Sequence, residues 1–498
     1  MNDVNTTESN SKGQILKSTA VFGSAQVIIV LVGILRTKIL AILLGPIGIG
    51  ISGLYQSVLD LFKTISGLGL GYSGVRDIAE ASATKNNQRI GEVILVLKRW
   101  LLSTGVIAAV LTIIFSKQIS QATFGDAAHA GSFVLLSVTL FLSALTTSQS
   151  AILQGLRRIT HMAKSIILAA IAGLVASAVI YYFLGINGIV LALIVASVIE
   201  LIITWFYSSK IKIDKATINM AKTFVQGKAM VKLGFFMTIS LLASTASMYF
   251  VRTFVVHQAG LDVVGYFIAA WTISSLYISA IFNAMAADYF PRLSAVQKDD
   301  VAIKKMVNDQ TDIALLLTVP LIVAMICFID LLVPLFYSRA FHETATILTW
   351  QLAGDFFKVL SWPLGFILLA KSKGTIFLCT EITWNILFCS LTFFGWKLFG
   401  IEVTGIAFLL AYFVYLVVVY VVVGKLIQFQ WSVRVWKAIM IFSPLLMLSF
   451  LSARFLNGSM KFLLGGLITL IAFAYSYVQL QTVVDFKTIK RHVLKKVF

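Results

Sequence analysis

Residues that carry out enzyme chemistry are scarce in this sequence. Among its 498 residues there are three cysteines and five histidines, and charged residues make up only 12%. The histidines are not spaced as metal ligands, and neither a Walker A loop nor a GxSxG elbow is present. Cys327, Cys379 and Cys389 have no CxxC spacing, so neither a disulfide framework nor a zinc site is indicated. The sequence therefore predicts no catalytic residues, no metal and no cofactor, and a protein that is not an enzyme.

Acidic residues are few as well, 21 against 40 lysines and arginines, which gives a formal net charge of +19. A charge of this size is found in nucleic-acid-binding proteins, but no zinc finger, RNA-binding or basic-zipper pattern is present. Hydrophobic residues make up 59% of the chain, well above the roughly 45–50% of soluble domains. We therefore predict a multi-pass membrane protein with basic loops and no nucleic-acid partner.

Apolar windows of about twenty residues predict an all-α protein with about fourteen membrane-spanning helices. The predicted spans lie at about residues 15–44, 51–74, 96–116, 131–155, 163–184, 188–208, 233–256, 264–288, 311–337, 345–370, 374–396, 402–424, 436–454 and 462–483.

Lysine and arginine are distributed very unevenly between the two sets of loops. If the N-terminus is cytoplasmic, 30 of the 40 lie in cytoplasmic segments and five on the opposite side. The positive-inside rule then places both termini in the cytoplasm.

A weak internal repeat divides the predicted helices into two six-helix lobes. Arg36-Thr37 recurs as Arg252-Thr253, and each pair is followed forty residues later by an arginine, at Arg76 and Arg292. Repeats of the same orientation are common in transporters. The predicted segments are a polar cytoplasmic N-terminus (1–14), an N-lobe (15–208), a basic linker (209–232), a C-lobe (233–424), two additional helices (425–484) and a basic cytoplasmic tail (485–498).

Five cations fall inside predicted helices, namely Arg36, Lys38, Lys63, Arg252 and Lys358. A charge at the centre of a membrane helix costs roughly 2.5 to 3.5 kcal/mol on insertion scales, so it usually faces a polar interior, an anion or a partner charge. Arg36 and Lys38 have an alternative interpretation, because each lies within roughly 10 to 14 Å of the helix end and its long side chain could snorkel to the headgroups.

Asp60, Glu200, Asp355 and Glu381 lie well inside the predicted helices. Asp60 and Lys63 are three residues apart, and Asp355 and Lys358 repeat that spacing, which puts each acid and base on one helix face. Each pair either takes part in function or only neutralises itself. Glu200 and Glu381 are lone acids in apolar sequence, where burial would favour protonation at neutral pH, as a proton-coupled carrier needs. The alternative is an acid that is only hydrogen-bonded in its neutral form or paired with one of the cations.

The intramembrane cations exceed these acids by one. A cavity lined in this way would attract a phosphate or diphosphate, which arginine grips in a bidentate manner and lysine neutralises as a point charge. Side chains suited to sugar hydroxyls are Gln56, Tyr72, Trp362, Trp384 and Asn385. Tyrosine and tryptophan are also common interfacial anchors, which is the alternative for those residues.

Several of these residues lie in motifs that resemble the Wzx-type polysaccharide-lipid flippases, a group that includes O-antigen translocases and the lipid III flippase of enterobacterial common antigen. The resemblance is strongest from Trp350 through Asp355 and Lys358, along 365–371 and at Thr380-Glu381. It extends to Lys38, to Leu44-Gly45-Pro46 and to Tyr249-Phe-Val-Arg252, and spans about residues 15–425.

The resemblance implies the fold of the multidrug/oligosaccharidyl-lipid/polysaccharide (MOP) exporters, with two six-helix lobes around a cationic central cavity. It further implies that an undecaprenyl-diphosphate-linked oligosaccharide is moved from the cytoplasmic to the periplasmic leaflet of the bacterial inner membrane. Arg36, Lys38, Lys63, Arg252 and Lys358 would hold the diphosphate, and Asp60, Asp355, Glu200 and Glu381 would orient the cations or couple transport. The expected partners are membrane lipids and a polysaccharide polymerase or chain-length regulator.

Two other hypotheses fit the same helices. A multidrug or organic-ion exporter of the same fold would want an acidic or aromatic cavity, which the positive excess disfavours. A membrane scaffold or polymerase of polysaccharide assembly would need no continuous cavity and should have apolar packing in its place.

Overall fold

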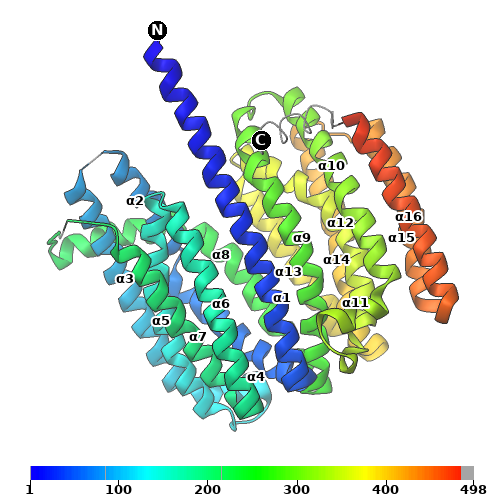
Figure 1. Ribbon diagram of the computed structural model, residues 1–498, viewed down its shortest axis with the longest axis horizontal. Helices are drawn as coiled ribbons and strands as arrows, with labels where there is room; N and C mark the ends of the chain where they lie inside the picture. The colour runs from blue at the N-terminus through cyan, green and yellow to red at the C-terminus, as the bar shows by residue number, and fades with distance from the viewer. Residues whose placement is uncertain (1, 85, 215, 484–498) are drawn as a thin grey trace, which may run out of the picture. The chain divides into compact units, whose positions relative to one another are not determined.

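The computed structural model is helical in every regular element that it describes (Figure 1). It describes the backbone of residues 2–84, 86–214 and 216–483, and side chains from Ile28 onward within these ranges, except at residues 233, 236, 237, 284, 287 and 291. The side chains of the predicted polar N-terminus (1–14) and the predicted basic tail (485–498) lie outside the described residues. The elements are α1 (Asn2–Gly67), α2 (Leu70–Ala83), α3 (Asn87–Ile114), α4 (Ser116–Phe124), α5 (Ala130–Gly155), α6 (Ile159–Leu184), η1 (Gly185–Gly188), α7 (Ile189–Ser209), α8 (Met220–Ala259), α9 (Leu261–Ala295), α10 (Asp300–Cys327), α11 (Ile329–Phe336), η2 (Arg339–Phe341), α12 (Thr344–Ala370), α13 (Gly374–Phe399), η3 (Gly400–Glu402), α14 (Val403–Ile427), α15 (Val433–Phe455) and α16 (Gly458–Val483).

The helices agree with the predicted membrane spans in type and nearly in position. Within the described residues, 11 stretches are long and apolar enough to cross a membrane. Two of them, 159–209 and 374–427, each contain two separate helices, and a third, 28–67, is broken at Gly45. The prediction of a multi-pass all-α membrane protein is confirmed, and the number fourteen stays a prediction.

The break in α1 lies at Gly45-Pro46, between the first two predicted spans. Gly45 has φ 64° and ψ −166°, a conformation that glycine adopts without the steric cost that other residues incur. Pro46 follows it, and its fixed φ suits the first turn of the second limb of α1. The turn therefore divides α1 into a limb that carries Arg36 and Lys38 and a limb that carries Asp60 and Lys63.

Glycines let the second limb of α1 approach the start of α9 at backbone distance. A Cβ on Gly50 would overlap the carbonyl oxygen of Leu261, and a Cβ on Gly265 would overlap that of Pro46. Gly53 lies against the side chain of Ile268 in the same row of contacts. The turn and the beginning of α9 thus fix each other's position.

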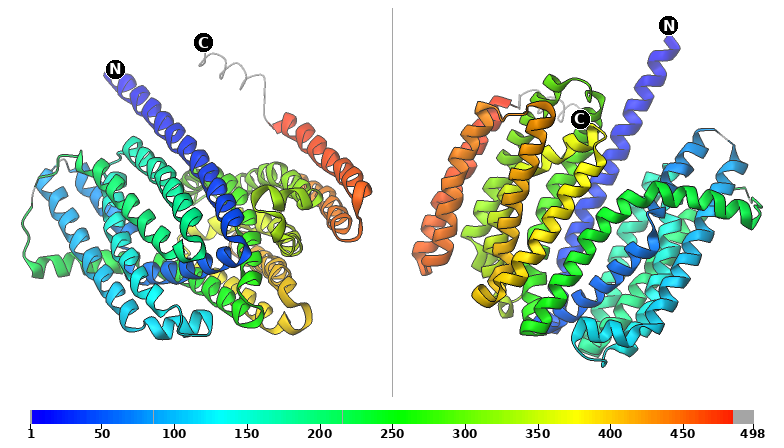
Figure 2. Two further views of the ribbon diagram at one scale, coloured as in Figure 1. Left: turned by 60° about the horizontal axis from the view of Figure 1, so that its bottom comes forward. Right: turned by 180° about the vertical axis from the view of Figure 1, so that it is seen from behind.

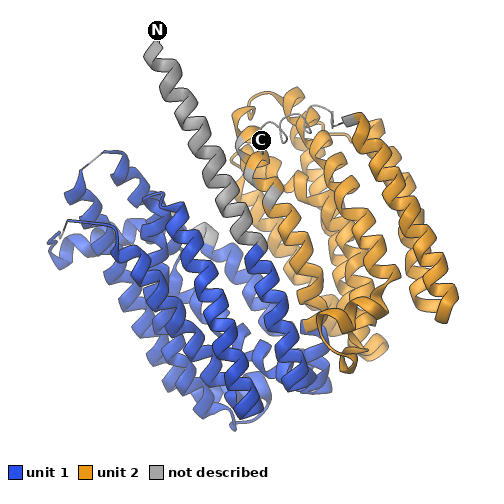
Figure 3. Ribbon diagram, in the orientation of Figure 1, with its two compact units in different colours: residues 1–268 blue, residues 269–498 orange. Residues whose placement is uncertain are grey.

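The contacts divide the chain into two compact units, residues 1–268 (unit 1) and 269–498 (unit 2) (Figure 3). The sequence repeat instead places the boundary between the lobes in the linker at 209–232. The boundary between the two units lies later in the chain because α8 packs on α1, α2, α3 and α4, all of which belong to unit 1. The lobe boundaries drawn from the repeat stay a prediction.

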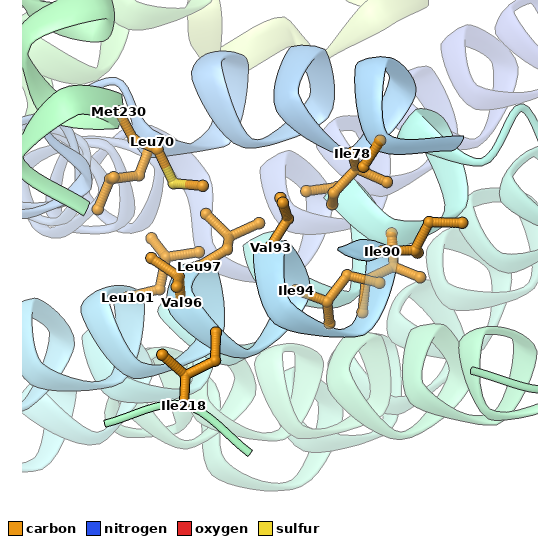
Figure 4. Close-up of a cluster of buried hydrophobic side chains, with 13 residues drawn as sticks. Leu70, Ile78, Ile90, Val93, Ile94, Val96, Leu97, Leu101, Ile218 and Met230 are labelled. Atoms are coloured by element: carbon orange, nitrogen blue, oxygen red, sulfur yellow. The ribbon is translucent and has the colours of Figure 1, made fainter. Parts of the chain in front are cut away.

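Unit 1 has an apolar cluster between α2 and α3 that includes part of the predicted linker (Figure 4). Ile218 and Met230 are buried in this cluster with Leu70 and Leu97. Much of the stretch at 209–232 is therefore not a plain loop, since α8 already begins at Met220. Arg99 of α3 also binds this segment, because its Nη1 donates to the carbonyl of Ile218 at 2.9 Å and to the hydroxyl of Thr223 at 2.8 Å.

In unit 2, α15 and α16 pack on each other and on α10, as the view from behind shows (Figure 2). Ion pairs hold the two helices at both ends. At one end, Arg434 Nε lies 2.7 Å from Asp312 Oδ2 of α10. At the other end, Arg454 pairs with Glu402 at 3.1 Å and Lys461 pairs with Asp330. The two additional helices are thus an integrated part of unit 2.

A half-buried histidine joins α1 to the connection between α4 and α5. The imidazole Nδ1 of His129 is 2.8 Å from the hydroxyl of Tyr55, and Phe124 stacks on the ring at 3.9 Å between centroids. Desolvation by burial lowers the pKa of His129 from its ordinary value of 6.5, and Asp126 partly opposes this shift. The folded protein therefore favours the neutral imidazole.

The close approach at Gly265 predicts a loss of stability in Gly265→Ala. The new methyl group must displace the Pro46 carbonyl, and overpacking of this kind costs about 1–3 kcal/mol. We expect the melting temperature to fall by several degrees, measured by fluorescence in detergent. Gly33→Ala is the matched control, since nothing lies within 4 Å of its Cβ position. Equal melting temperatures for the two variants would contradict the packing described above.

The His129 environment predicts that stability decreases in mild acid. Because the folded state binds a proton less readily than the unfolded chain, the contribution of His129 is fully present above the ordinary pKa of 6.5 and is lost as the pH falls below that value. The melting temperature of the wild type should fall between pH 7.5 and pH 5.5 by more than that of His129→Gln. The exposed His342 supplies the control variant His342→Gln, which should follow the wild type.

Candidate functional site

The second limb of α1 carries a carboxylate and an ammonium on one half-buried face. Asp60 and Lys63 lie three residues apart and interact electrostatically. Gln56, one turn earlier, donates from Nε2 to Asp60 Oδ1 at 2.7 Å. The predicted acid–base pair of this helix is therefore present, and Gln56 orients the acid.

Arg252 of α8, a helix that packs on α1, joins this group. Its Nη1 donates to the Ser57 hydroxyl at 2.6 Å and to the Gly53 carbonyl at 3.2 Å, and the guanidinium interacts electrostatically with Asp60. Its Nε is buried and has no hydrogen-bond partner among the described residues. Arg252, Asp60 and Lys63 form the group that we call the unit 1 charge cluster.

Arg36 and Lys38 are half-buried on the first limb of α1. Arg36 interacts with the hydroxyl of Tyr181 on α6. A guanidinium that binds a tyrosine of a neighbouring helix has a polar partner inside the protein, so snorkelling is not needed to explain Arg36. Thr37 between them donates to the carbonyls of Gly33 and Ile34 at 3.1 and 3.0 Å.

Two predicted residues of unit 1 have surroundings other than those expected. The apolar sequence around Glu200 predicts a buried acid, but the structure exposes its side chain on α7. Leu193 and Thr204 are the residues of this helix that are buried near it in sequence. An apolar sequence around an acid does not decide which way the helix turns it. Tyr72 of α2 is also exposed, at 61%.

Unit 2 contains a cavity of about 270 Å³ between three consecutive membrane helices. Lys358 lies on its wall together with Glu381 and the aromatic rings of Trp362 and Trp384. The structure therefore brings together four residues that the sequence predicted separately. The lining comes from α12, α13 and α14 and consists of Lys358, Ser361, Trp362, Gly365, Phe366, Leu369, Phe377, Glu381, Trp384, Tyr412 and Tyr415.

One ammonium interacts with two carboxylates at this cavity. Lys358 interacts electrostatically with Asp355 and with Glu381. Its ammonium also lies 5.5 Å from the centroid of the Tyr412 ring, within cation–π range. Asp355 is fully buried, and its Oδ2 accepts from the Ser274 hydroxyl at 2.7 Å. One ammonium thus serves two carboxylates.

Glu381 is positioned by its neighbours on α13 and α14. Its Oε1 accepts from the Tyr415 hydroxyl at 2.7 Å. Asn385, one turn along, donates from Nδ2 to the main-chain carbonyl of Glu381 at 2.8 Å. Asn385 itself is buried at 3% exposure behind the cavity, so it supports Glu381 and is not part of the lining.

Several buried polar atoms around the cavity have no protein partner among the described residues. They include the indole Nε1 of Trp384, Oδ1 of Asn385 and Oδ1 of Asp355. The side chain of Gln351, one turn before Asp355, is fully buried with neither amide atom bonded. Buried polar groups normally find partners in protein or ordered water, so this region has unused capacity to bind water or hydroxyl groups.

The sequence interpretation missed Tyr412 and Tyr415. They are three residues apart on α14, and the hydroxyl of Tyr415 holds Glu381 while the ring of Tyr412 faces Lys358. The available signal in the sequence was a pair of tyrosines at helical spacing within a predicted membrane helix. Trp362 has a further role, because its ring stacks on Phe282 of α9 at 4.5 Å between centroids.

Solved structures define the class of protein to which this fold belongs. An inward-facing multidrug resistance transporter of the MATE family, in the MOP superfamily, aligns with a TM-score of 0.67 over 82% of this chain and 98% of its own, at 16% identity. The lipid II flippase MurJ in an inward closed conformation aligns with a TM-score of 0.68 over 94% of this chain and 99% of its own, at 14% identity. The chain therefore has the MOP exporter fold.

The sequence comparisons give the family. The profile of polysaccharide biosynthesis proteins matches residues 39–346. A candidate O-antigen transporter of Shigella flexneri is 30% identical over 352 residues, 68% of this chain and 81% of that protein. The lipid III flippase of Escherichia coli K12 is 23% identical over 358 residues, 70% of this chain and 84% of that protein. The chain belongs to the polysaccharide biosynthesis protein family, as the resemblance predicted.

The bond between Tyr415 and Glu381 predicts the result of removing one hydroxyl. Tyr415→Phe leaves the ring in place but deprives a buried acid of its donor, which costs about 1–3 kcal/mol. The melting temperature should fall by several degrees. Tyr420→Phe, on the same helix, is the matched control, because its hydroxyl makes no hydrogen bond with any residue that the structure describes. If both variants melt alike, the hydroxyl of Tyr415 does not hold Glu381.

Proposed function

We propose that this protein is a flippase that moves an undecaprenyl-diphosphate-linked oligosaccharide, an O-antigen unit or a related surface-polysaccharide repeat, from the cytoplasmic to the periplasmic leaflet by alternating access. The relatives named above, one a lipid III flippase and one a candidate O-antigen transporter, support the substrate class. The observation that carries the proposal is the cavity of unit 2, where Lys358 lies between two carboxylates and beside aromatic rings within membrane helices.

The diphosphate is the part of such a substrate that needs cations. In our proposal each unit contributes its own cations, Lys358 in unit 2 and Arg36, Lys38, Lys63 and Arg252 in unit 1. Asp355 and Glu381 share the charge of Lys358. A bound diphosphate therefore competes with the two acids for one ammonium. This competition weakens the binding of the anion enough for it to be released.

The acids connect this competition to a coupling ion. When Asp355 or Glu381 takes up a proton, Lys358 is released to bind the anion, and when the proton leaves, the carboxylate displaces the anion. Asp60 has the same relation to Lys63 and Arg252 in unit 1. Glu200 is exposed and has no neighbouring cation in this scheme, so we assign it no binding role.

The sugars need hydroxyl partners and flat surfaces. Trp362 and Trp384 line the cavity beside Lys358, and the unbonded Nε1 of Trp384 is a donor for a hydroxyl group. Gln56 is positioned next to Asp60 in unit 1. A polar route for the sugar avoids the cost of drawing hydroxyls through hydrocarbon, while the prenyl chain stays in lipid.

The proposal also implies where the protein lies and which partners it has. The protein would lie in the bacterial inner membrane with both termini in the cytoplasm, as its loop charges predict. It would act without enzymatic chemistry, with membrane lipids around it and a polymerase or chain-length regulator receiving its product.

A double variant distinguishes binding from simple charge neutralisation at Lys358. Lys358→Gln should lower flipping about tenfold or more, since a charged hydrogen bond contributes about 1.5–3 kcal/mol. Lys358→Gln with Asp355→Asn also removes the fully buried acid that would lose its cation, while Glu381 keeps its bond from Tyr415, and should restore folding without restoring flipping. In a strain that lacks its own flippase, mass spectrometry measures the accumulated lipid-linked oligosaccharide, and surface polysaccharide measures transport.

Lys425→Gln is the control, because Lys425 lies in the last turn of α14 and does not line the cavity. Protein amounts in the membrane must be equal for all variants. Full surface polysaccharide from the double variant would show that Lys358 only neutralises Asp355 and would refute its role in binding.

A further inference from the structure

A second hollow, separate from the cavity of α12, α13 and α14, lies between the adjacent ends of α15 and α16 in unit 2. Its volume is about 410 Å³, and its lining is Val433, Arg434, Lys437, Tyr475, Gln479 and Thr482. Five of these six side chains carry hydrogen-bond donors. A hollow with this lining favours a ligand rich in acceptor oxygens.

Ion pairing and hydrogen bonds hold Arg434 rigidly at the edge of the hollow. Its Nε is 2.7 Å from Oδ2 of the buried Asp312, and its Nη2 donates to the Thr482 hydroxyl at 3.0 Å and to the Gln479 main-chain carbonyl at 3.3 Å. The side chain is still 42% exposed. Arg434 is therefore oriented before any ligand binds, and Asp312 balances its charge.

Lys437 supplies the positive charge that is not balanced. It is exposed one turn after Arg434 and makes no ion pair with any residue that the structure describes. Asp309, on α10, is the other acid that interacts with Asp312, and it is exposed to solvent. The start of α15 adds the positive end of a helix dipole on the same side.

Hydrogen bonds also hold the segment that leads into α15. Asn308 of α10 accepts from the main-chain N–H of Ser432 at 2.7 Å and donates to the carbonyl of Gln430 at 3.2 Å. Ser432 then caps α15 by accepting from the N–H of Val435. The shape of the hollow is therefore set by the protein.

The surroundings of the hollow are those of a membrane–water interface. Trp431 and Trp436 pack together at this end of unit 2 with 5.3 Å between ring centroids, and Trp436 is 43% exposed. Tryptophan is enriched at the level of lipid headgroups. The lysine and arginine distribution predicts that this side is cytoplasmic, where the leaflet is rich in anionic lipid.

We propose that this hollow binds the phosphodiester headgroup of an anionic membrane phospholipid, with Lys437 on the phosphate and Gln479 and Tyr475 on the headgroup oxygens. The ligand is a resident lipid that stabilises the α15–α16 pair and not the transported substrate. The site is independent of the flippase proposal, because none of its residues lines the cavity that contains Lys358.

The test uses the full-length protein in detergent with defined lipids, and native mass spectrometry counts the bound lipids. The wild type should retain phosphatidylglycerol in preference to phosphatidylcholine. Lys437→Gln should lower the affinity for phosphatidylglycerol about five- to tenfold, the size expected for one charged contact, and leave phosphatidylcholine unchanged. Gln479→Leu should also weaken it, since the bond from Arg434 goes to the Gln479 main chain and survives the substitution.

Lys425→Gln is the matched control, a basic residue at the end of the neighbouring helix that does not line the hollow. An equal loss in this control would show a diffuse basic surface and overturn the proposal. The proposal would also be overturned if the wild type bound phosphatidylglycerol and phosphatidylcholine equally. Displacement of phosphatidylglycerol by millimolar inorganic phosphate would assign the site to a soluble anion and overturn the lipid assignment.

Discussion

The hydrocarbon core of a membrane contains almost no water, so each charge placed there needs a partner within the protein. Unit 1 meets this constraint by joining Arg252 of α8 to Ser57 and Asp60 of α1. Unit 2 meets it by placing Lys358 between Asp355 and Glu381. The pairing joins neighbouring helices within each unit, and in our proposal its groups exchange partners when an anion or a proton arrives.

The partners are unequally matched in unit 2, where two carboxylates share one ammonium. Such an arrangement is less stable than a simple pair because one acid is always under-compensated, and the Ser274 and Tyr415 hydroxyls supply part of the difference. Buried networks with unused hydrogen-bonding capacity are costly and therefore usually serve a function. Gln351, Asp355 and Trp384 add buried polar atoms that have no hydrogen-bond partner among the described residues.

The same constraint explains how α15 and α16 belong to unit 2. Their outward surfaces are strongly apolar, and their charged residues lie at the helix ends, where Arg434, Arg454 and Lys461 each pair with an acid of another element. These pairs tie the two helices to α10, η3 and α11. The arrangement gives these helices a structural role in unit 2 whatever they bind.

Local properties could be predicted from the sequence. Helix type and approximate limits follow from apolar runs, the break at Gly45-Pro46 follows from the two residues that cannot continue a helix, and the spacing of Asp355 and Lys358 puts both on one face whatever surrounds them. The resemblance also led to the correct family. These features depend only on neighbours along the chain.

Only the tertiary structure decided which side chains meet across helices. Arg252 with Ser57, Glu381 with Tyr415 and Arg434 with Asp312 join residues that are 195, 34 and 122 positions apart, and no periodicity specifies such pairs. The exposed position of Glu200 was decided in the same way, because the rotation of α7 about its axis is set by packing and not by the residues around the acid. The sequence by itself determined that this chain would carry charges into a membrane, and the packing of the helices determined how those charges are paired.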